Sequence, residues 1–158
     1  MIYHPIEPFY DNDSKILILG SFPSVKSREQ MFFYGHQQNR FWHVISKVYN
    51  CELPNTIEEK KILLKKYKIA LWDVIASCEI LGSSDSSIKN VTPNNLETIL
   101  NNSNIEKIFV NGKTAEKFYN IYLREKIMRD AICLPSTSPA NAKWSLEDLI
   151  FEWKKILL

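Results

Sequence analysis

The sequence predicts an α/β protein, a three-layer α/β/α sandwich built around a four-stranded, mainly parallel sheet. Four short apolar segments, each followed by a helical pattern, are the expected strands: 15–19, 69–75, 107–111 and 131–135. Connections long enough to contain a helix favour parallel pairing. Three of these strands end in polar loops, GSFPS, NGK and PSTSPAN, and parallel sheets bind ligands beyond the carboxyl ends of their strands. We therefore expect the three loops to converge on one site.

The first third of the chain contains the longest predicted loop. Residues 1–14 form an irregular arm before the first strand, and Ser27 with Gln30 fits a capping box that starts a short helix after it. A longer helix is predicted from Asn39 to a point before Pro54, because apolar residues recur at helical spacing: Phe41, Val44, Ile45 and Val48. The stretch between the first strand and this helix is the main candidate for a site.

The middle of the chain alternates helix and strand signals. Thr56 and Glu59 form a capping box that opens a helix to about Tyr67. After the second strand, the serine-rich segment 77–90 predicts a loop at the edge of the sheet. The Thr-Pro dipeptide at 92–93 predicts an N-cap and the first turn of the next helix.

The last two helices follow the third and fourth strands. One is predicted to begin after Gly112, and the other at a capping box that starts at Ser145. The resulting order of strands and helices is that of a parallel sheet covered on both faces.

Length and composition limit the classes of protein. A chain of 158 residues predicts a single domain, 1–158. No apolar run approaches the roughly 20 residues needed to cross a bilayer, and the acidic start does not resemble a secretory signal. We expect a cytoplasmic monomer without a membrane partner.

Cysteine spacing and net charge narrow the chemistry. Cys51, Cys78 and Cys133 match no zinc or iron–sulfur spacing, so we expect reduced thiols and no metal, cluster or other cofactor. The net charge of +2 does not by itself predict nucleic-acid binding. Any contact with DNA must therefore be local.

Residues 32–40 combine aromatic rings with amide and imidazole groups, a mixture that suits a nucleobase. Asn39 is interpreted either as an N-cap or as an amide that positions a water or a leaving base. His36 is either a loop hydrogen-bonding group or a general acid or base. Tyr34 is either a core aromatic or a ring that stacks on a base.

Each later candidate also has a structural explanation. Asn111 belongs to an Asn-Gly turn, or its amide binds a base edge. Residues 136–140 form a rigid loop or a phosphate clamp. Asp73 and Asp85 are interpreted as structural caps or turn formers. Walker, GxGxxG, HExxH and GxSxG patterns are absent from the sequence, which argues against nucleotidases, dehydrogenases, zincins and serine hydrolases.

The motifs GSFPS, FFYGHQQNRFW, NGK and LPSTSPAN, in this order, resemble the uracil-DNA glycosylase superfamily. Within it they are most similar to the hypoxanthine-DNA glycosylase branch, which is close to the mismatch-specific uracil glycosylases. The resemblance extends from Ile16 to the last helix. It implies a four-stranded α/β/α sandwich that removes a deaminated base from double-stranded DNA.

The resemblance also implies roles for individual residues. Phe22 occupies the position of the water-activating Asp or Asn of other branches, and Asn39 that of the catalytic amide of the hypoxanthine branch. The implied base-binding residues are Phe22, Tyr34, Asn111 and Ser136. The implied DNA-backbone residues are Ser24, Lys113, Ser138 and Asn141. The chain departs from the family pattern at Gln37, where the family often has proline, and at Ala140, which is a poor wedge.

These observations predict a monofunctional DNA glycosylase that flips and excises hypoxanthine in base excision repair. The alternatives within enzymes are a uracil or a G:U/T mismatch-specific glycosylase with the same pocket, and a nucleotide- or tRNA-processing hydrolase, which would turn over free nucleosides or RNA. An alternative of another class is a DNA-damage binding module without catalysis, because Phe22 cannot polarise a water.

Overall fold

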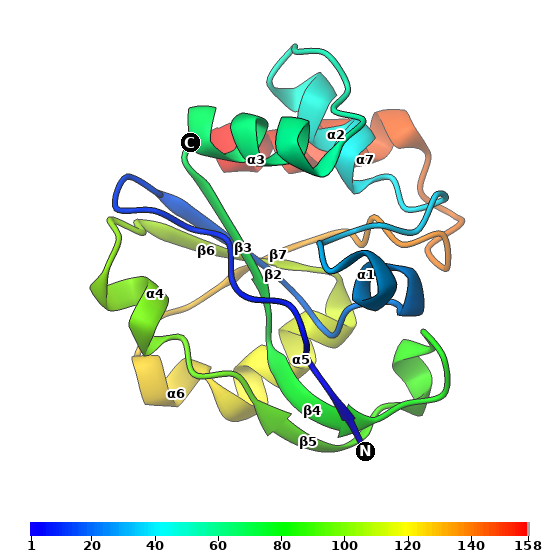
Figure 1. The fold of residues 1–158 in the computed structure, drawn as a ribbon, viewed down its shortest axis with the longest axis vertical. Coiled ribbons are helices and arrows are strands. Elements are labelled where there is room, and N and C mark those ends of the chain that lie inside the picture. Colours follow the sequence, from blue (N-terminus) through cyan, green and yellow to red (C-terminus); the bar gives the residue numbers. More distant parts are fainter. Residues whose placement is uncertain (158) are drawn as a thin grey trace.

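The computed structural model describes residues 1–157 and contains the predicted parallel sheet (Figure 1). Its strand order is β3-β2-β6-β7, and every neighbouring pair is parallel. The strands are β2 (Ile16–Gly20), β3 (Ile69–Asp73), β6 (Lys107–Asn111) and β7 (Ile132–Leu134). The predicted fold class is confirmed.

Helices cover both faces of this sheet (Figure 1). One layer contains α2 (Phe41–Val48), α3 (Ile57–Lys66) and α7 (Leu146–Trp153), and the chain then passes into a short 3-10 helix, η2 (Lys154–Leu157). The other layer contains α4 (Glu97–Asn101), α5 (Lys113–Tyr122) and α6 (Arg124–Ile127). The short α1 (Val25–Gln30) lies beside the carboxyl end of the sheet.

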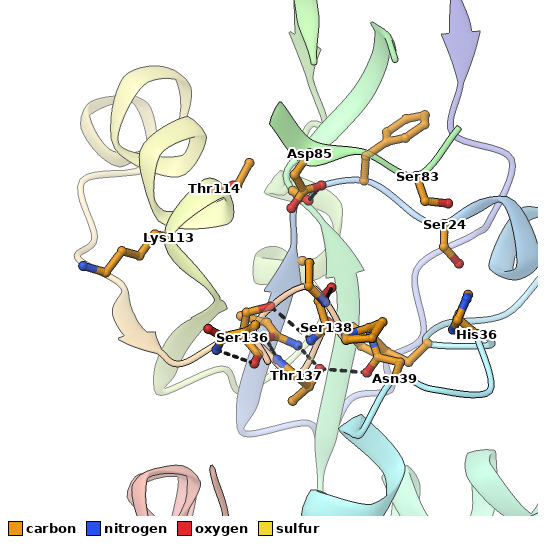
Figure 2. A pocket seen from close by; sticks show the side chains of 18 of the residues that line it. Ser24, His36, Asn39, Ser83, Asp85, Lys113, Thr114, Ser136, Thr137 and Ser138 are labelled. Atoms are coloured by element: carbon orange, nitrogen blue, oxygen red, sulfur yellow. Dashed lines mark hydrogen bonds between the residues drawn. The ribbon is translucent and has the colours of Figure 1, made fainter. Parts of the chain in front are cut away.

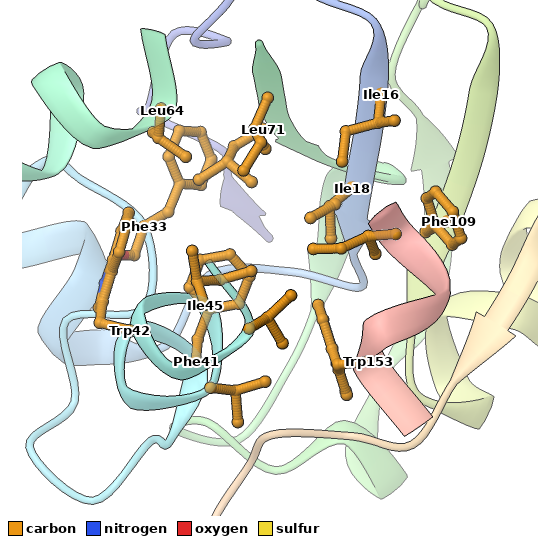
Figure 3. Packing of buried hydrophobic residues seen from close by; sticks show 14 of the residues in the cluster. Ile16, Ile18, Phe33, Phe41, Trp42, Ile45, Leu64, Leu71, Phe109 and Trp153 are labelled. Carbon is orange, nitrogen blue, oxygen red and sulfur yellow. The ribbon is translucent and has the colours of Figure 1, made fainter. Parts of the chain in front are cut away.

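The alternation of side chains along β2 explains why the strand is apolar throughout. Ile16 and Ile18 pack into the core beneath α2, α3 and α7, whereas Leu17 and Leu19 pack into the core beneath α4 and α5. A strand covered by helices on both faces has no solvent side, so both sets of alternating residues are apolar. Figure 3 shows the first core, where Ile18 lies near Phe41 and Trp153.

A second, antiparallel sheet replaces two predicted elements. Its strands are β1 (Ile2–Tyr3), β4 (Ile75–Glu79) and β5 (Lys89–Pro93), in the order β1-β4-β5. The predicted loop over 77–90 is therefore wrong at both ends, and only its centre, with the 3-10 helix η1 (Asp85–Ser87), lies outside the strands. The segment is polar because the sheet is only half covered, which permits polar residues on one face.

The predicted helix start at 92–93 is also wrong. Pro93 pairs with Ile75 at the end of β5, which is an edge strand, where a missing N–H is tolerated. The predicted strand 69–75 is divided at Val74, whose N–H donates to the Gly20 carbonyl at 2.8 Å. The chain then turns from the parallel sheet into β4, and α4 begins only after Leu96.

Two helix starts have the predicted side-chain caps. Thr56 Oγ1 accepts from Glu59 N at 3.1 Å, and Ser145 Oγ accepts from Asp148 N at 3.1 Å. The short helix α1 exists, but its cap is Ser24, whose Oγ accepts from Ser27 N at 3.1 Å, so the predicted Ser27 capping box is wrong. Within residues 1–157, no helix combines the length and apolarity needed to cross a membrane.

Candidate active site

A cavity of about 970 Å³ opens at the carboxyl edge of the parallel sheet (Figure 2). All three predicted polar loops line it: the turn after β2, the start of α5 after β6, and the loop 135–141 after β7. The segment 83–86 between β4 and β5 and the stretch from Phe33 to Asn39 complete the wall. The cavity lies at the upper end of the range of about 300–1,000 Å³ that is typical of ligand sites.

Three neutral side chains form a hydrogen-bonded chain along one side of the cavity (Figure 2). Thr137 Oγ1 donates to Asn39 Oδ1 at 2.8 Å and accepts from Asn111 Nδ2 at 3.0 Å. The Thr137 N–H donates to Asn111 Oδ1 at 3.0 Å, so both amide atoms of Asn111 are engaged. Thr137 is fully buried. It therefore connects the start of α2 to the end of β6.

The bonds made by Asn39 determine which part of its amide is available. Asn39 Oδ1 also accepts from Phe41 N at 2.9 Å, and because a backbone N–H can only donate, this atom must be the oxygen. Both of its acceptor positions are thus occupied. Among residues 1–157, no group accepts a hydrogen bond from Asn39 Nδ2. The free function of Asn39 in the cavity is consequently that of a donor.

Arg40 anchors the 136–144 loop against the start of α2. Its N–H donates to the Thr137 carbonyl at 3.0 Å. The guanidinium donates to the carbonyls of Trp144 and Asn141, the latter at 3.1 Å. These contacts fix the loop that carries Thr137. Two consecutive residues, Asn39 and Arg40, therefore both bind Thr137.

Tyr34 lies at the inner wall of the cavity in a left-handed backbone conformation with φ 54°. Its ring stacks on Phe41, with centroids 4.0 Å apart. Its hydroxyl is buried and has no hydrogen-bond partner in the described part of the chain. Burial raises the pKa of this phenol, which therefore keeps its proton and can donate. An unpartnered buried hydroxyl costs roughly 1–3 kcal/mol.

A buried pair of a carboxylate and an imidazole lies near Tyr34, and its carboxylate lines the cavity. Asp73, at the end of β3, is only 4% exposed, and its Oδ2 lies 2.7 Å from His4 Nε2. Because His4 Nδ1 accepts from Ile6 N at 3.2 Å, Nε2 carries the proton that is donated to Asp73.

Gly20 allows Asp73 and Tyr34 to approach each other. A Cβ at Gly20 would lie 2.5 Å from Asp73 Oδ1 and 3.2 Å from Tyr34 Oη, which places the two oxygens less than about 6 Å apart. Any side chain at this position would collide with the carboxylate. Oδ1 is the acceptor that His4 leaves free, and it lies beside a hydroxyl that can donate.

Asp85 lies across the cavity from Asn39 and Thr137 (Figure 2). Its Oδ1 accepts from Ser21 Oγ at 3.0 Å. Partial burial, and secondarily the charge of Asp73, raise the pKa of this carboxyl, whereas the hydrogen bond from Ser21 lowers it. Through this hydrogen bond, the carboxyl of Asp85 ties the loop between β4 and β5 to the turn after β2.

The structure places the remaining base-site candidates on the cavity wall. Phe22 is buried with its ring edge-on to His4 at 5.9 Å and the Arg28 guanidinium 5.5 Å from its centroid, so it forms an apolar wall. His36 lines the cavity, and its Nδ1 accepts from Gln38 N at 3.1 Å, so it acts as a hydrogen-bonding group within its own loop.

The candidates for DNA contact surround the opening. Lys113 begins α5. Ser136 Oγ accepts from Ser138 N at 3.1 Å, and Asn141 Nδ2 donates to the Ser136 carbonyl at 2.9 Å, so these side chains shape the loop that they belong to. Ser24, which caps α1, lies across the opening from this loop.

Sequence reasoning did not single out His4 or Arg40 for a functional role, and it named Thr137 only as part of the 136–140 loop. His4 and Asp73 are 69 positions apart and come from segments with no joint motif. Arg40 and Thr137 lie inside recognised motifs, but only the fold shows that these motifs touch. Among residues 1–157, no group of three or more His, Cys, Asp or Glu side chains could hold a metal ion.

Comparisons with known proteins agree on one family. The family model described as the uracil DNA glycosylase superfamily matches residues 7–156. A protein named hypoxanthine DNA glycosylase from Methanosarcina acetivorans is 30% identical over 99% of this chain and 98% of its own length. One of the same name from Methanosarcina barkeri is 31% identical over 86% of each chain. A solution NMR structure of an M. acetivorans protein aligns with this chain over the full length of both chains, with a TM-score of 0.81 and 28% identity.

Proposed function

Because the chain belongs to the uracil DNA glycosylase superfamily, we propose that it is a monofunctional DNA glycosylase that excises hypoxanthine from double-stranded DNA. In this proposal the enzyme flips deoxyinosine out of the duplex and hydrolyses its N-glycosidic bond, as the first step of base excision repair. The names of the two Methanosarcina relatives support this choice of base. Extrusion costs least at a mispair, which favours damaged sites.

The observation that carries the choice of a deaminated base is the free carboxylate oxygen beside Gly20. Deamination converts an amino group and a neighbouring ring nitrogen into a carbonyl and an N–H. Asp73 lines the cavity, and its Oδ1 is an acceptor for that N–H. Adenine presents a ring nitrogen without a proton at this position, so two acceptors would face each other. A mismatched buried polar group is penalised strongly, which supports discrimination.

Asn39 is the proposed catalytic residue. As the glycosidic bond breaks, negative charge develops on the departing base, and the free Nδ2 of Asn39 can donate to it. The bonds from Phe41 and Thr137 hold the amide in this orientation before the base arrives, which reduces reorganisation during the reaction. No covalent intermediate is required, because water attacks the oxocarbenium-like sugar.

The other cavity residues have supporting roles in this proposal. Phe22 and Tyr34 pack against the base, and Ser136 and Asn111 shape its pocket through the loop that contains Thr137. Ser24, Lys113, Ser138 and Asn141 contact the DNA backbone around the opening. Such contacts position the duplex without selecting a sequence.

The test is base excision by Asn39→Asp, compared with the wild type on a deoxyinosine duplex. Aspartate retains an acceptor for Phe41 N and Thr137, so the local fold should survive, but it has no N–H to donate and adds a charge that repels the departing base. We expect a loss of kcat on the order of 1,000-fold with little change in Tm. Normal activity in this variant would remove Asn39 from the catalytic role.

Uracil presents the same carbonyl and N–H edge, so a uracil or mismatch-specific glycosylase is the second candidate. A panel of duplexes with hypoxanthine, uracil or xanthine, assayed for alkali-labile abasic sites, separates these activities. Binding to a deoxyinosine duplex without any abasic product would instead identify a damage-binding module.

A further inference from the structure

The N-terminal arm runs from β4 of the second sheet to β3 at the edge of the parallel sheet (Figure 1). Tyr3 pairs with Ser77 of β4, and the His4 N–H donates to the Ala76 carbonyl at 2.8 Å. Further along, Trp72 Nε1 donates to the Ile6 carbonyl at 3.0 Å. The arm is thus attached on both sides of the His4 side chain. Backbone pairing holds it at Tyr3 and His4, and the indole of Trp72 holds it at Ile6.

The His4 side chain is almost completely buried, at 2% exposure, and contacts the base-pocket side of β3. Its ring lies between Phe22 and Trp72, at centroid distances of 5.9 and 6.0 Å. In this apolar setting its Nε2 donates to Asp73 Oδ2 at 2.7 Å. A buried polar pair is weak evidence for a stabilising role, because apolar residues of similar size often serve as well without the desolvation cost.

The geometry around Asp73 gives this pair a different consequence. With Oδ2 occupied by His4, the carboxylate cannot rotate without losing that bond, and Oδ1 is held beside Gly20 and the Tyr34 hydroxyl. Asp73 lines the cavity, whereas His4 is not among the lining residues. His4 therefore acts on the cavity through its hydrogen bond to Asp73 and through its packing against Phe22, which also lines the cavity.

We propose that His4 is a positioning residue for base recognition, and that it holds Asp73 Oδ1 where it accepts from the ring N–H of the flipped base. The N-terminal arm is then part of the base pocket although it does not line it. This inference rests on the proposed function, because the ligand of Oδ1 is the deaminated base.

The test compares two substitutions that differ in one donor. His4→Gln keeps a side-chain N–H that can reach Asp73, whereas His4→Phe fills the space without a donor. Each variant is assayed on duplexes containing deoxyinosine or deoxynebularine, whose purine base has neither the carbonyl nor the ring N–H. Intrinsic bond lability cancels when the ratio of kcat/KM for the two substrates is compared between enzymes. His43→Phe, on the exposed side of α2, is the control for loss of a histidine.

We expect His4→Phe to lower kcat/KM on deoxyinosine on the order of tenfold and to reduce the inosine-to-nebularine ratio by a similar factor. His4→Gln should restore most of the ratio, and His43→Phe should leave it unchanged. A folded His4→Phe with the wild-type ratio overturns the inference. So does an equal loss on both substrates that follows a lower Tm, because that result indicates a structural role only.

The wild-type enzyme tests the underlying function separately. If it excises uracil but not hypoxanthine, the proposed substrate is wrong, and the same variants are compared on uracil and 3-methyluracil, which lacks the ring N–H. A His4→Phe variant that retains the wild-type preference between these two bases then refutes the role of His4 independently of the substrate.

Discussion

The two sides of the cavity differ in charge and in the source of their residues. One side is the neutral chain of Asn39, Thr137 and Asn111, in which each member binds the next. The other side has the His4 and Asp73 pair with the unpartnered Tyr34 hydroxyl. The first side offers an oriented donor, which suits stabilisation of a departing anion. The second offers a fixed carboxylate acceptor, which suits recognition of a base edge.

The difference predicts that changes on the two sides will have different kinetic signatures. A change on the Asn39 side should lower excision of every base that the enzyme accepts, because all leave with developing negative charge. A change on the Asp73 side should alter the choice between bases, because it removes a contact that only some of them can make.

After Asn39→Asp, the substitution Asp73→Asn should have the largest effect. His4 donates to Asp73, so the amide oxygen of the variant will face His4 and its NH₂ will face Tyr34 and the base. An acceptor thereby becomes a donor, and kcat/KM on deoxyinosine should fall on the order of 100-fold. The relative rate on deoxynebularine, which presents a ring nitrogen as an acceptor, should rise. An equal loss on both substrates would contradict a recognition role.

Thr137→Val should have the next largest effect. Valine keeps the shape of threonine but removes the hydroxyl, so Asn111 Nδ2 and Asn39 Oδ1 each lose a partner. We expect the free energy of unfolding to fall by about 1–3 kcal/mol and kcat to fall about tenfold on hypoxanthine and uracil alike. Thr137→Ser, which restores the hydroxyl, is the matched control. A change in base preference with kcat unaltered would place Thr137 on the recognition side instead.

The sequence predicted the neutral side better than the charged side for a physical reason. The carboxyl ends of neighbouring parallel strands must meet at one edge, so the loops after β2, β6 and β7 could be brought together from the strand pattern alone. The resemblance to the superfamily then added Asn39 as a candidate. The family match confirms the superfamily, and the role of Asn39 stays a prediction.

The charged side depends on contacts that no local pattern encodes. The segment 77–90 is polar and contains Gly82, which predicts a loop. In the structure its first residues belong to β4, which pairs with β1 and β5, and its last two residues belong to β5. The arm that provides His4 is ordered by this second sheet. Without β4, neither the path of the arm nor the pairing of His4 with Asp73 can be predicted.

Tyr34→Phe should have the smallest effect on activity and should raise stability. The phenyl ring retains the stacking on Phe41 at 4.0 Å, and the substitution removes a buried hydroxyl that has no partner within residues 1–157. The free energy of unfolding should therefore rise by about 1 kcal/mol, as measured by denaturant unfolding. Excision of hypoxanthine should stay within about twofold of the wild type, because this hydroxyl is buried away from the cavity space. A loss of both stability and activity would instead indicate that the hydroxyl makes an ordinary structural contact.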